Sequence, residues 1–337
     1  MNHSPFPRLA LATLALASFS TAQEGARKIT ISPKAGEVVV YRSTQTQKQT
    51  MEAMGQESIN EIVTDLKVAV DEVAADGTVK VTATWLRLRG NLQSMMGEMQ
   101  FDTKKPEDAG DNPMLEGFAE GCTALINQKT VITFGPDGKL KDKKPLEELA
   151  QKLTDKLTGQ AKMIFQGIVG VHVLEGQVSV FGTFPQEPVA TGGTWTEKKD
   201  MGGRGGLNMQ SEVTHKLASA GDDMFVIATT GTLTAVPPKE KEENDKADDD
   251  EGAAMMRNMM RDAKIKNGKV EAESKVSRKD GLLLSSTNTS QMEIHMTNPM
   301  GGDEPFVVGV KQSTKVERAK EEADAKDSKG APASPKK

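Results

Sequence analysis

The chain has 337 residues, of which 36% are hydrophobic but only 4% aromatic, and its formal net charge is −5. This length allows a sizeable core, although few aromatic side chains are available to anchor it. Positive and negative residues are interspersed, and no basic stripe with interleaved aromatics occurs. The composition therefore argues against nucleic acid as a partner.

The first residues have the layout of a secretory signal peptide. Arg8 precedes an apolar stretch, Leu9–Ala17, and the small residues Ser20-Thr21-Ala22 follow it. The apolar stretch is too short to span a bilayer, and no later segment is long and apolar enough to do so. We therefore expect residues 1–22 to be removed near Ala22 and the protein to be exported, to the periplasm or beyond, without a transmembrane segment.

Most of the remaining chain alternates between apolar and polar residues with the period of a β-strand. A flexible N-terminus is expected over 23–34, and a single β-rich domain over 35–317. Within it, residues 36–50 form a first strand, and residues 58–90 form a long hairpin around the Asp-Gly turn of Ala74–Gly77. The high Thr, Ser, Gln and Lys content of the strands indicates an antiparallel sheet with one face in water.

Further strands follow the same pattern later in the chain. They are predicted over 130–140, which contains a Pro-Asp-Gly turn, over a hairpin at 210–236 with its turn near Gly221, over a hairpin at 266–296 that turns at 279–281, and over 305–317. The glycine-rich segment 201–208 lies between two strand-like segments and lacks the residues of a phosphate-binding loop. It is expected to be a flexible hairpin loop.

The central segment has a helical period instead. Residues 145–159 begin with a proline at a first helical position and place four leucines on one stripe, namely Leu146, Leu149, Leu153 and Leu157. Residues 160–174 are apolar nearly throughout and are expected to be buried as a second helix, around Ile164. Periodicity alone leaves a strand open as the alternative for this second segment.

Two segments have the composition of disordered chain. A charge-dense acidic insertion covers about 237–254, between two predicted strands, and residues 318–337 mix charge with Ala, Ser and Pro. Neither has the apolar content that a packed core requires.

Four methionines follow the acidic run. Met255, Met256, Met259 and Met260 would share one side of a short helix, which would need an apolar surface to dock against. We interpret them as a candidate contact for a ligand or partner, close to the mouth or edge of the sheet. The chain has 18 methionines in all.

Copper(I) is the alternative partner for these methionines, because thioethers are soft ligands. A second cluster, Met292, His295, Met296 and Met300, extends the theme. No methionine cluster carries cysteines or paired histidines, so packing or an adaptable apolar surface is the favoured interpretation. No metal site and no cofactor are predicted.

Catalytic constellations are missing from the sequence. The three histidines of the mature chain, His172, His215 and His295, each lie in an apolar or strand context that favours a structural role, and no nucleophile elbow, zinc-protease motif or P-loop occurs. The single cysteine, Cys122, precedes an apolar run and is expected to be buried and inert. We therefore predict no catalytic residues and no enzymatic activity.

A short motif opens the second half of the domain. Pro185 stiffens an extended approach, Gly192 permits a tight turn beyond Val189, and Trp195 begins a new strand that it anchors in the core. With the Asp-Gly hairpin and the element Phe101-Asp102-Thr103, this motif resembles an exported bacterial family of unknown function. The resemblance covers about residues 35–317, and it implies an antiparallel β-rich fold and export but no catalytic residues.

Together the patterns predict an α+β fold that is mainly antiparallel β. It is a curved sheet or half-barrel of long hairpins, with one or two helices from the central segment packed on its concave face. The leading functional hypothesis is a non-enzymatic exported protein that binds an apolar ligand or an acylated partner, either a lipid or an envelope protein. The alternative is a structural or interaction protein of the cell envelope, and the third hypothesis is a Met-rich copper-binding protein.

Overall fold

The computed structural model describes residues 26–94, 97–105, 113–155, 157, 162, 165–167, 169–204, 207–236, 263–298 and 304–319. The strands are β1 (Val38–Met51), β2 (Gln56–Val73), β3 (Val79–Ser94), β4 (Gly97–Asp102), β5 (Lys129–Phe134), β6 (Thr194–Arg204), β7 (Leu207–Ala220), β8 (Met224–Ala235), β9 (Lys264–Ser277), β10 (Leu283–Met296) and β11 (Phe306–Arg318). The helices are η1 (Glu52–Met54), α1 (Pro113–Leu125), α2 (Lys144–Thr154) and α4 (Val171–Val178).

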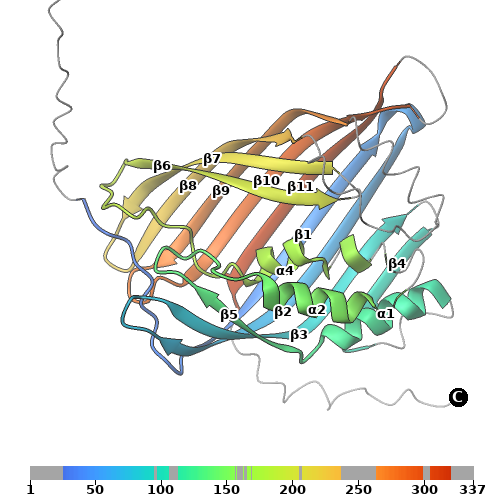
Figure 1. Ribbon diagram of the computed structural model, residues 1–337. Coiled ribbons are helices and arrows are strands. Elements are labelled where there is room, and N and C mark those ends of the chain that lie inside the picture. Colours follow the sequence, from blue (N-terminus) through green and yellow to red (C-terminus); the bar gives the residue numbers. More distant parts are fainter. Residues whose placement is uncertain are drawn as a thin grey trace, which may run out of the picture.

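All of these strands belong to one antiparallel sheet, in the order β4-β3-β2-β1-β11-β10-β9-β8-β7-β6, with β5 paired beside β4 on β3. The first and last strands of the chain are therefore neighbours in the middle of the sheet, where β1 pairs with β11. Figure 1 shows the sheet curling so that β6 and β7 turn towards the side on which the helices lie. The sheet is curved and not closed into a barrel, which confirms the predicted fold class.

The predicted hairpins are present, and their turns have the expected chemistry. Between β2 and β3, the backbone N–H of Ala74 donates to the carbonyl of Thr78, and Asp76 Oδ1 accepts from the N–H of Thr78 at 2.8 Å. Strands β6 and β7 run through the glycine-rich segment, because Arg204 still pairs with Leu207. The flexible loop expected over 201–208 is therefore strand over most of its length.

A β-bulge in β3 was not visible in the sequence pattern. Residues Leu66 and Asp65 of β2 face Trp85 and Arg87, which leaves Leu86 as the extra residue of the bulge. In a regular strand, residues three positions apart point to opposite faces. Because of the bulge, Trp85 and Leu88 point to the same face, and both are fully buried. Arg87 consequently points to the other face and forms an ion pair with Asp102 of β4.

The helices lie over one end of the sheet. Helix α1 packs against β3 and β4, and α2 packs against β5 and α4. The helix predicted over 145–159 is confirmed as α2, with Leu146, Leu149 and Leu153 buried. The second helix, predicted over 160–174, overlaps with α4 at residues 171–174. Ile164 lies outside the described residues. Helix α1 was not predicted.

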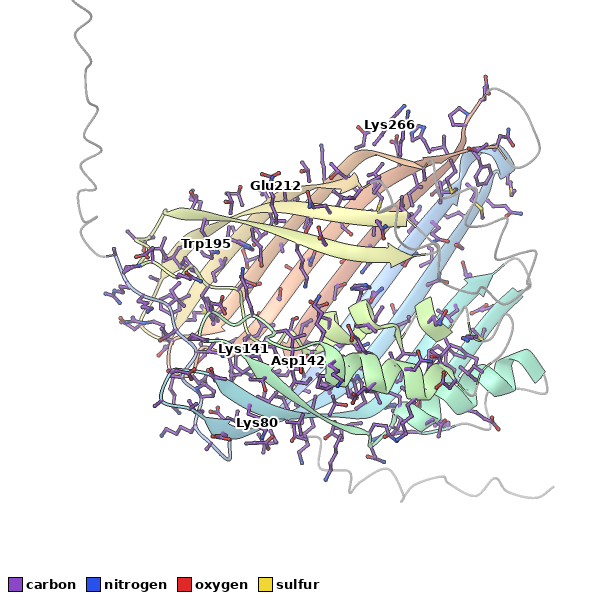
Figure 2. The ribbon with its side chains drawn as sticks, viewed as in Figure 1. Lys80, Lys141, Asp142, Trp195, Glu212 and Lys266 are labelled. Carbon is purple, nitrogen blue, oxygen red and sulfur yellow. The ribbon has the colours of Figure 1, made fainter. Side chains whose placement is uncertain are left out.

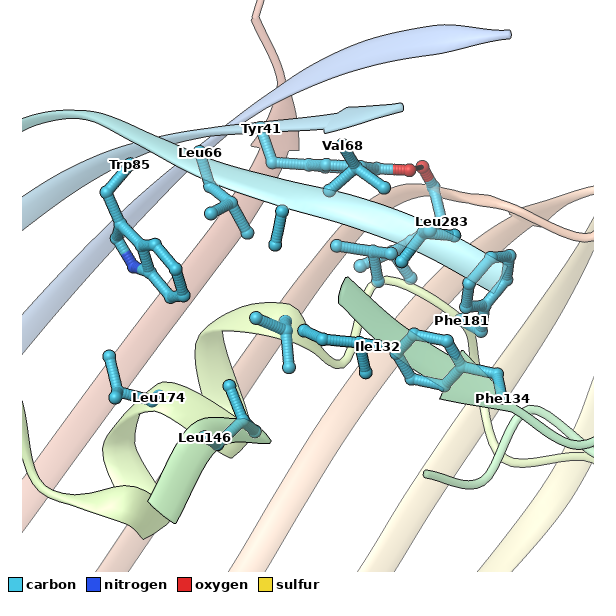
Figure 3. Packing of buried hydrophobic residues seen from close by; sticks show 14 of the residues in the cluster. Tyr41, Leu66, Val68, Trp85, Ile132, Phe134, Leu146, Leu174, Phe181 and Leu283 are labelled. Atoms are coloured by element: carbon cyan, nitrogen blue, oxygen red, sulfur yellow. Dashed lines mark hydrogen bonds between the residues drawn. The ribbon is translucent and has the colours of Figure 1, made fainter. Parts of the chain in front are cut away.

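The main core is the cluster between these helices and the sheet. Figure 3 shows its centre, where Trp85 and Leu66 of the sheet face Leu146 and Leu174 of the helices. Tyr41 is buried among them, and its hydroxyl donates to the carbonyl of Leu283 at 3.1 Å. Burial of this many side chains on one face of the sheet supplies the main stabilisation of the fold.

The ends of the described domain extend beyond the predicted boundaries. Arg27 pairs with Val189, and Ile29 and Ile31 are buried in the main core. The prediction of a flexible N-terminus over 23–34 is therefore wrong for these residues. Ile29 and Ile31 are buried although they belong to no long alternating segment of the sequence. At the other end, Arg318 donates to the Leu283 carbonyl and pairs with Asp280, although the tail was predicted to begin at 318.

Candidate binding face

The helices identify one face of the sheet as the concave face. On β2, the side chains of Thr64, Leu66 and Val68 are buried against the helix layer, and Tyr41 faces Leu66 across the pair with β1. Because successive side chains alternate between faces, the strand register carries this assignment to every neighbouring strand. The opposite side is called the outer face, and it includes the exposed residues Glu212 and Lys266 (Figure 2).

The far end of the concave face carries a second apolar cluster, remote from the main core. We call it the distal apolar cluster. It consists of the buried residues Leu207, Ala263 and Met296 and the half-buried residues Met209, Ala235, Ile265, Ile294, Phe306 and Val308. Every one of them comes from strands β7 to β11 or from the residue before β9, and within the described residues no helix contributes to it.

A polar floor, formed by residues of β1, β11 and β10, lies between the two apolar clusters. We define it as Ser43, Gln45, Gln47, Gln312, Thr314, Asn288 and Ser290. The register places these residues side by side: Gln45 faces Thr314, Gln47 faces Gln312, and Gln312 faces Ser290. The concave face is thus not apolar throughout, because a polar zone lies between its two apolar clusters.

A small hollow opens where the polar floor meets the helix layer. Its walls are Ser43, Gln45, Ile62, Thr64, Gly167, Val173 and Gln177. The amide of Gln177 is held in place, because it accepts a hydrogen bond from Trp85 Nε1 at 2.7 Å and donates to Thr64 Oγ1 at 3.4 Å. The hollow is therefore polar, and its shape depends on the packing of α4 on β2 and β3.

The edge strand β6 carries a charged group on the concave face. The rings of Trp195 and His215 stack with their centroids 5.2 Å apart, and His215 Nε2 lies 3.5 Å from Glu197 Oε2. Lys139, from the turn after β5, pairs with Glu197 at 3.2 Å. The neighbouring imidazole of His215, followed by the ammonium group of Lys139, lowers the pKa of Glu197 to about 2.

A second ion-pair group joins β6 to helix α4. The carboxylate of Glu175 is buried, and it pairs with Lys143 at 2.9 Å and with Lys199 of β6 at 3.0 Å. Burial alone would raise the pKa of Glu175, but the two lysines hold it below its ordinary value. Ion pairs, rather than strand pairing, thus connect the free edge of the sheet to the helix layer.

The residues of the Pro185 motif lie in the segment that leads into β6. Gly192 has φ +88° in a turn, and its N–H donates to the carbonyl of Leu217. Val189 is buried, and β6 begins one residue before Trp195, which is half-buried against the main core. Pro185 lies half-buried in the extended approach. These residues position the edge strand and do not form a binding group.

The candidate contact residues Met255, Met256, Met259 and Met260 lie outside the described residues. The second methionine cluster is described in part. Met296 belongs to the distal apolar cluster on the concave face, whereas the neighbouring His295 lies on the outer face, 3.5 Å from Glu293. Because Met296 and His295 point to opposite faces, they cannot share a copper ion.

Within the residues that the structure describes, no group of three or more His, Cys, Asp or Glu side chains is placed to hold a metal ion. Cys122 is fully buried, and burial raises the pKa of its thiol, as expected for an unreactive side chain. None of the described helices is long and apolar enough to cross a membrane.

Sequence reasoning missed the polar floor, although its signal was present. In β1 the residues on the face of Tyr41 are Ser43, Gln45, Gln47 and Gln49, so the buried row of that strand turns polar after one residue. The Thr, Ser, Gln and Lys content of the strands predicts one face in water, but in β1 the glutamines on the face of Tyr41 belong to the concave face.

Comparison with known proteins places the fold in a family. Residues 76–283 match a family of unknown function (DUF6263), and the chain belongs to that family. The expectation of a β-rich antiparallel family without an assigned function is thereby confirmed. No curated protein matches the chain.

Two solved structures are similar to the chain at low identity. One is from a study of lipid-protein interactions in lipovitellin, with 7% identity and a TM-score of 0.40, covering 85% of this chain and 25% of that one. The other is DynF from the dynemicin biosynthesis pathway of Micromonospora chersina, with 8% identity, a TM-score of 0.20, and coverage of 87% and 85%. The chain thus spans about a quarter of the lipovitellin chain. At these TM-scores neither likeness bears on function.

Proposed function

We propose that the protein is an exported, non-enzymatic binding protein for an apolar ligand or an acylated partner, and that the distal apolar cluster is the surface that receives it. The observation that carries this proposal is the half-buried state of Ile265, Ile294, Phe306 and Val308 on the concave face. A ligand that covers the remaining exposed surface of these side chains removes apolar area from water, and this burial favours binding.

An acyl chain suits this cluster because the free energy of removing it from water grows with the length of the chain. Each methylene group that leaves water contributes about 0.8 kcal/mol. The cluster extends across five neighbouring strands, β7 to β11, and thus offers an elongated apolar strip rather than a single side-chain pocket. A flat polar ligand would gain little from such a surface.

The methionine segment keeps its place in this proposal. Ala235 and Ala263, the described residues on either side of this segment, both belong to the cluster. Met260 is three residues before Ala263 in the sequence. Met255, Met256, Met259 and Met260 are therefore proposed as further contacts of the same ligand or partner. Their combined replacement by serine should weaken binding without unfolding the protein, and unchanged affinity would leave the segment as a spacer.

The test is a titration of the purified protein with a fluorescent analogue of palmitate. The variant Val308→Asp places a charge in the cluster and should weaken binding at least tenfold. The matched control is Val131→Asp, because Val131 is 44% exposed on β5, away from the cluster. No binding to the unmodified protein, or equal binding to both variants, would overturn the proposal. An empty, compact protein in native mass spectrometry would instead favour the structural or interaction role.

Export is part of the same proposal and has its own measurement. The N-terminal sequence of the protein recovered from outside the cytoplasm should begin at Gln23. Recovery of the uncut chain from the cytoplasm alone would remove an envelope lipid or envelope protein as the partner.

A further inference from the structure

We propose that the polar floor selects the headgroup of the bound lipid, and that this headgroup is neutral and rich in hydroxyls, as in a glycolipid. The inference rests on the proposed function, since the acyl chain would occupy the distal apolar cluster. It adds a class of ligand that neither the family nor the apolar cluster identifies.

The floor is built from amide and hydroxyl side chains in adjacent rows. Gln45 and Gln47 on β1 face Thr314 and Gln312 on β11, and Gln312 faces Ser290 on β10. These side chains are half-buried. Each amide or hydroxyl can both donate and accept a hydrogen bond, which matches the mixed donor and acceptor character of a sugar hydroxyl.

Charge is kept off the floor by the alternation of the same strands. Lys48, Lys311 and Lys315 are exposed on the outer face, each next in sequence to a residue on or beside the floor. On β9, Glu271 and Glu273 are likewise exposed on the outer face, while Ala272 and Ser274 take the concave side. The separation of charge from the floor therefore runs across the centre of the sheet.

Within the part of the chain that the structure describes, the charged side chains on the concave face of the strands are engaged elsewhere. Arg318 pairs with Asp280, and Lys199 pairs with Glu175. Glu197 pairs with Lys139. Among the described residues no free cation lies on the floor, so a phosphate or carboxylate headgroup there would lose water without gaining a cation from them, which is costly at a half-buried site. A neutral headgroup loses less and regains its hydrogen bonds from the side chains of the floor.

The spacing between the floor and the cluster fits an amphiphile. Gln312 of the floor and Val308 of the cluster are four residues apart on β11, which is about 13 Å along a strand. The same separation divides Gln47 from Met51 on β1, whose partner is Val308. A headgroup on the floor and an acyl chain on the cluster can therefore belong to one molecule.

The hollow beside α4 gives the floor an inner wall. Ser43 and Gln45 of the floor line it together with Gln177, whose amide is fixed by Trp85 and Thr64. An amide that is already oriented loses less conformational entropy when it binds a hydroxyl group. The geometry points to this end of the floor as the place where the headgroup is held.

The experiment compares two lipids with identical acyl chains. Affinity is measured for monogalactosyl dipalmitoylglycerol and for dipalmitoyl phosphatidylglycerol, each presented in the same neutral detergent. The unmodified protein should bind the galactolipid at least tenfold more tightly. Gln312→Met, which removes the amide at similar volume, should reduce this preference to about twofold or less, and Gln312→Lys should shift it towards the phosphatidylglycerol.

The neighbouring residue provides the matched control. Lys311→Met changes an exposed side chain on the outer face of the same strand and should leave the preference unchanged. Equal affinity for the two lipids, or a preference for phosphatidylglycerol, would overturn this inference while the acyl-chain proposal stands. Failure to bind either lipid or the palmitate analogue would overturn both.

Discussion

The two ends of the concave face belong to one sheet, but they differ in how far their apolar side chains are buried. At one end the helices and the segment around Phe181 and Phe184 cover the sheet, and Trp85, Leu88 and Val79 have no exposed surface. At the distal end most apolar members of the cluster, such as Ile294 and Val308, remain half-buried. The comparison teaches that one strand pattern serves stability where helices cover it and leaves half-buried apolar surface where they do not.

The largest effect on stability is expected from substitutions that compare the helix-covered end of the concave face with its distal end. Trp85→Ala removes a fully buried side chain that also donates to Gln177, and it should lower the free energy of unfolding by about 3–5 kcal/mol. Ile294→Ala, in the distal cluster, should cost about 1 kcal/mol, because part of that side chain already contacts water. Chemical denaturation of both variants measures the difference. Equal losses would show that the distal cluster is core and not binding surface.

A smaller effect is expected for the ion pair that joins Glu197 of β6 to Lys139 in the turn after β5. Glu197 has a pKa of about 2 in the folded protein against 4.5 for the ordinary group. An acid with a lowered folded pKa stabilises the fold fully above its unfolded pKa, so this contribution should disappear as the pH falls from about 4.5 to about 2. We expect a loss of about 2 kcal/mol, discounted because Lys139 is half exposed.

The pH experiment has a clear control in Glu197→Gln. Denaturation of this variant at several pH values should show a flatter dependence between about pH 4.5 and 2 than the unmodified protein. An unchanged slope would mean that Glu197 does not contribute to the link between β6 and the Lys139 turn.

A further test addresses the turn through which the chain enters β6. Gly192 has φ +88°, so Gly192→Ala should cost about 1 kcal/mol through backbone strain. Gly176 lies in helix α4 with open space around its Cα, so Gly176→Ala should be neutral or stabilise by up to about 1 kcal/mol. Thermal unfolding of the pair measures both signs. A harmless Gly192→Ala would show that the turn tolerates another conformation.

The smallest effect is expected for the ion pair between β6 and α4. Lys199 is 46% exposed, so Lys199→Met should change the free energy of unfolding by less than about 1 kcal/mol. A double-mutant cycle with Glu175→Gln isolates the pairwise contribution. A coupling well above this value would mean that the edge strand is held by this ion pair rather than by its pairing with β7.

Part of the fold could be predicted because its signals are local. The hairpin over 58–90 combines alternation with an Asp-Gly turn, and the helix over 145–159 combines a proline start with a leucine stripe. Helix α1 escaped prediction because its own sequence contains Gly117 and Gly121, which lower helix propensity. Gly121 is explained by packing, since a Cβ there would lie 2.8 Å from the ring of Phe165.

The candidate site was predicted less well than the fold. The sequence suggested an apolar ligand or acylated partner and, as its contacts, the four methionines of 255–260. The described residues place a polar floor at the centre of the concave face and half-buried apolar side chains at its distal end. The floor brings together β1 and β11, whose sequences are more than 250 residues apart. No local pattern in either strand announces that they are neighbours.

The sequence by itself determined which segments are strands, where most hairpins turn, and which side chains of each strand share a face, because these properties depend on the period-two geometry of the chain. Only the tertiary structure decided that β1 pairs with β11 and that helices cover one end of the concave face. It also decided that uncharged amides meet at the centre of that face, beside a half-buried apolar strip. Long-range pairing and coverage depend on how distant segments pack together, and the alternation within one strand is the same whether its inner face meets a helix, water or a ligand.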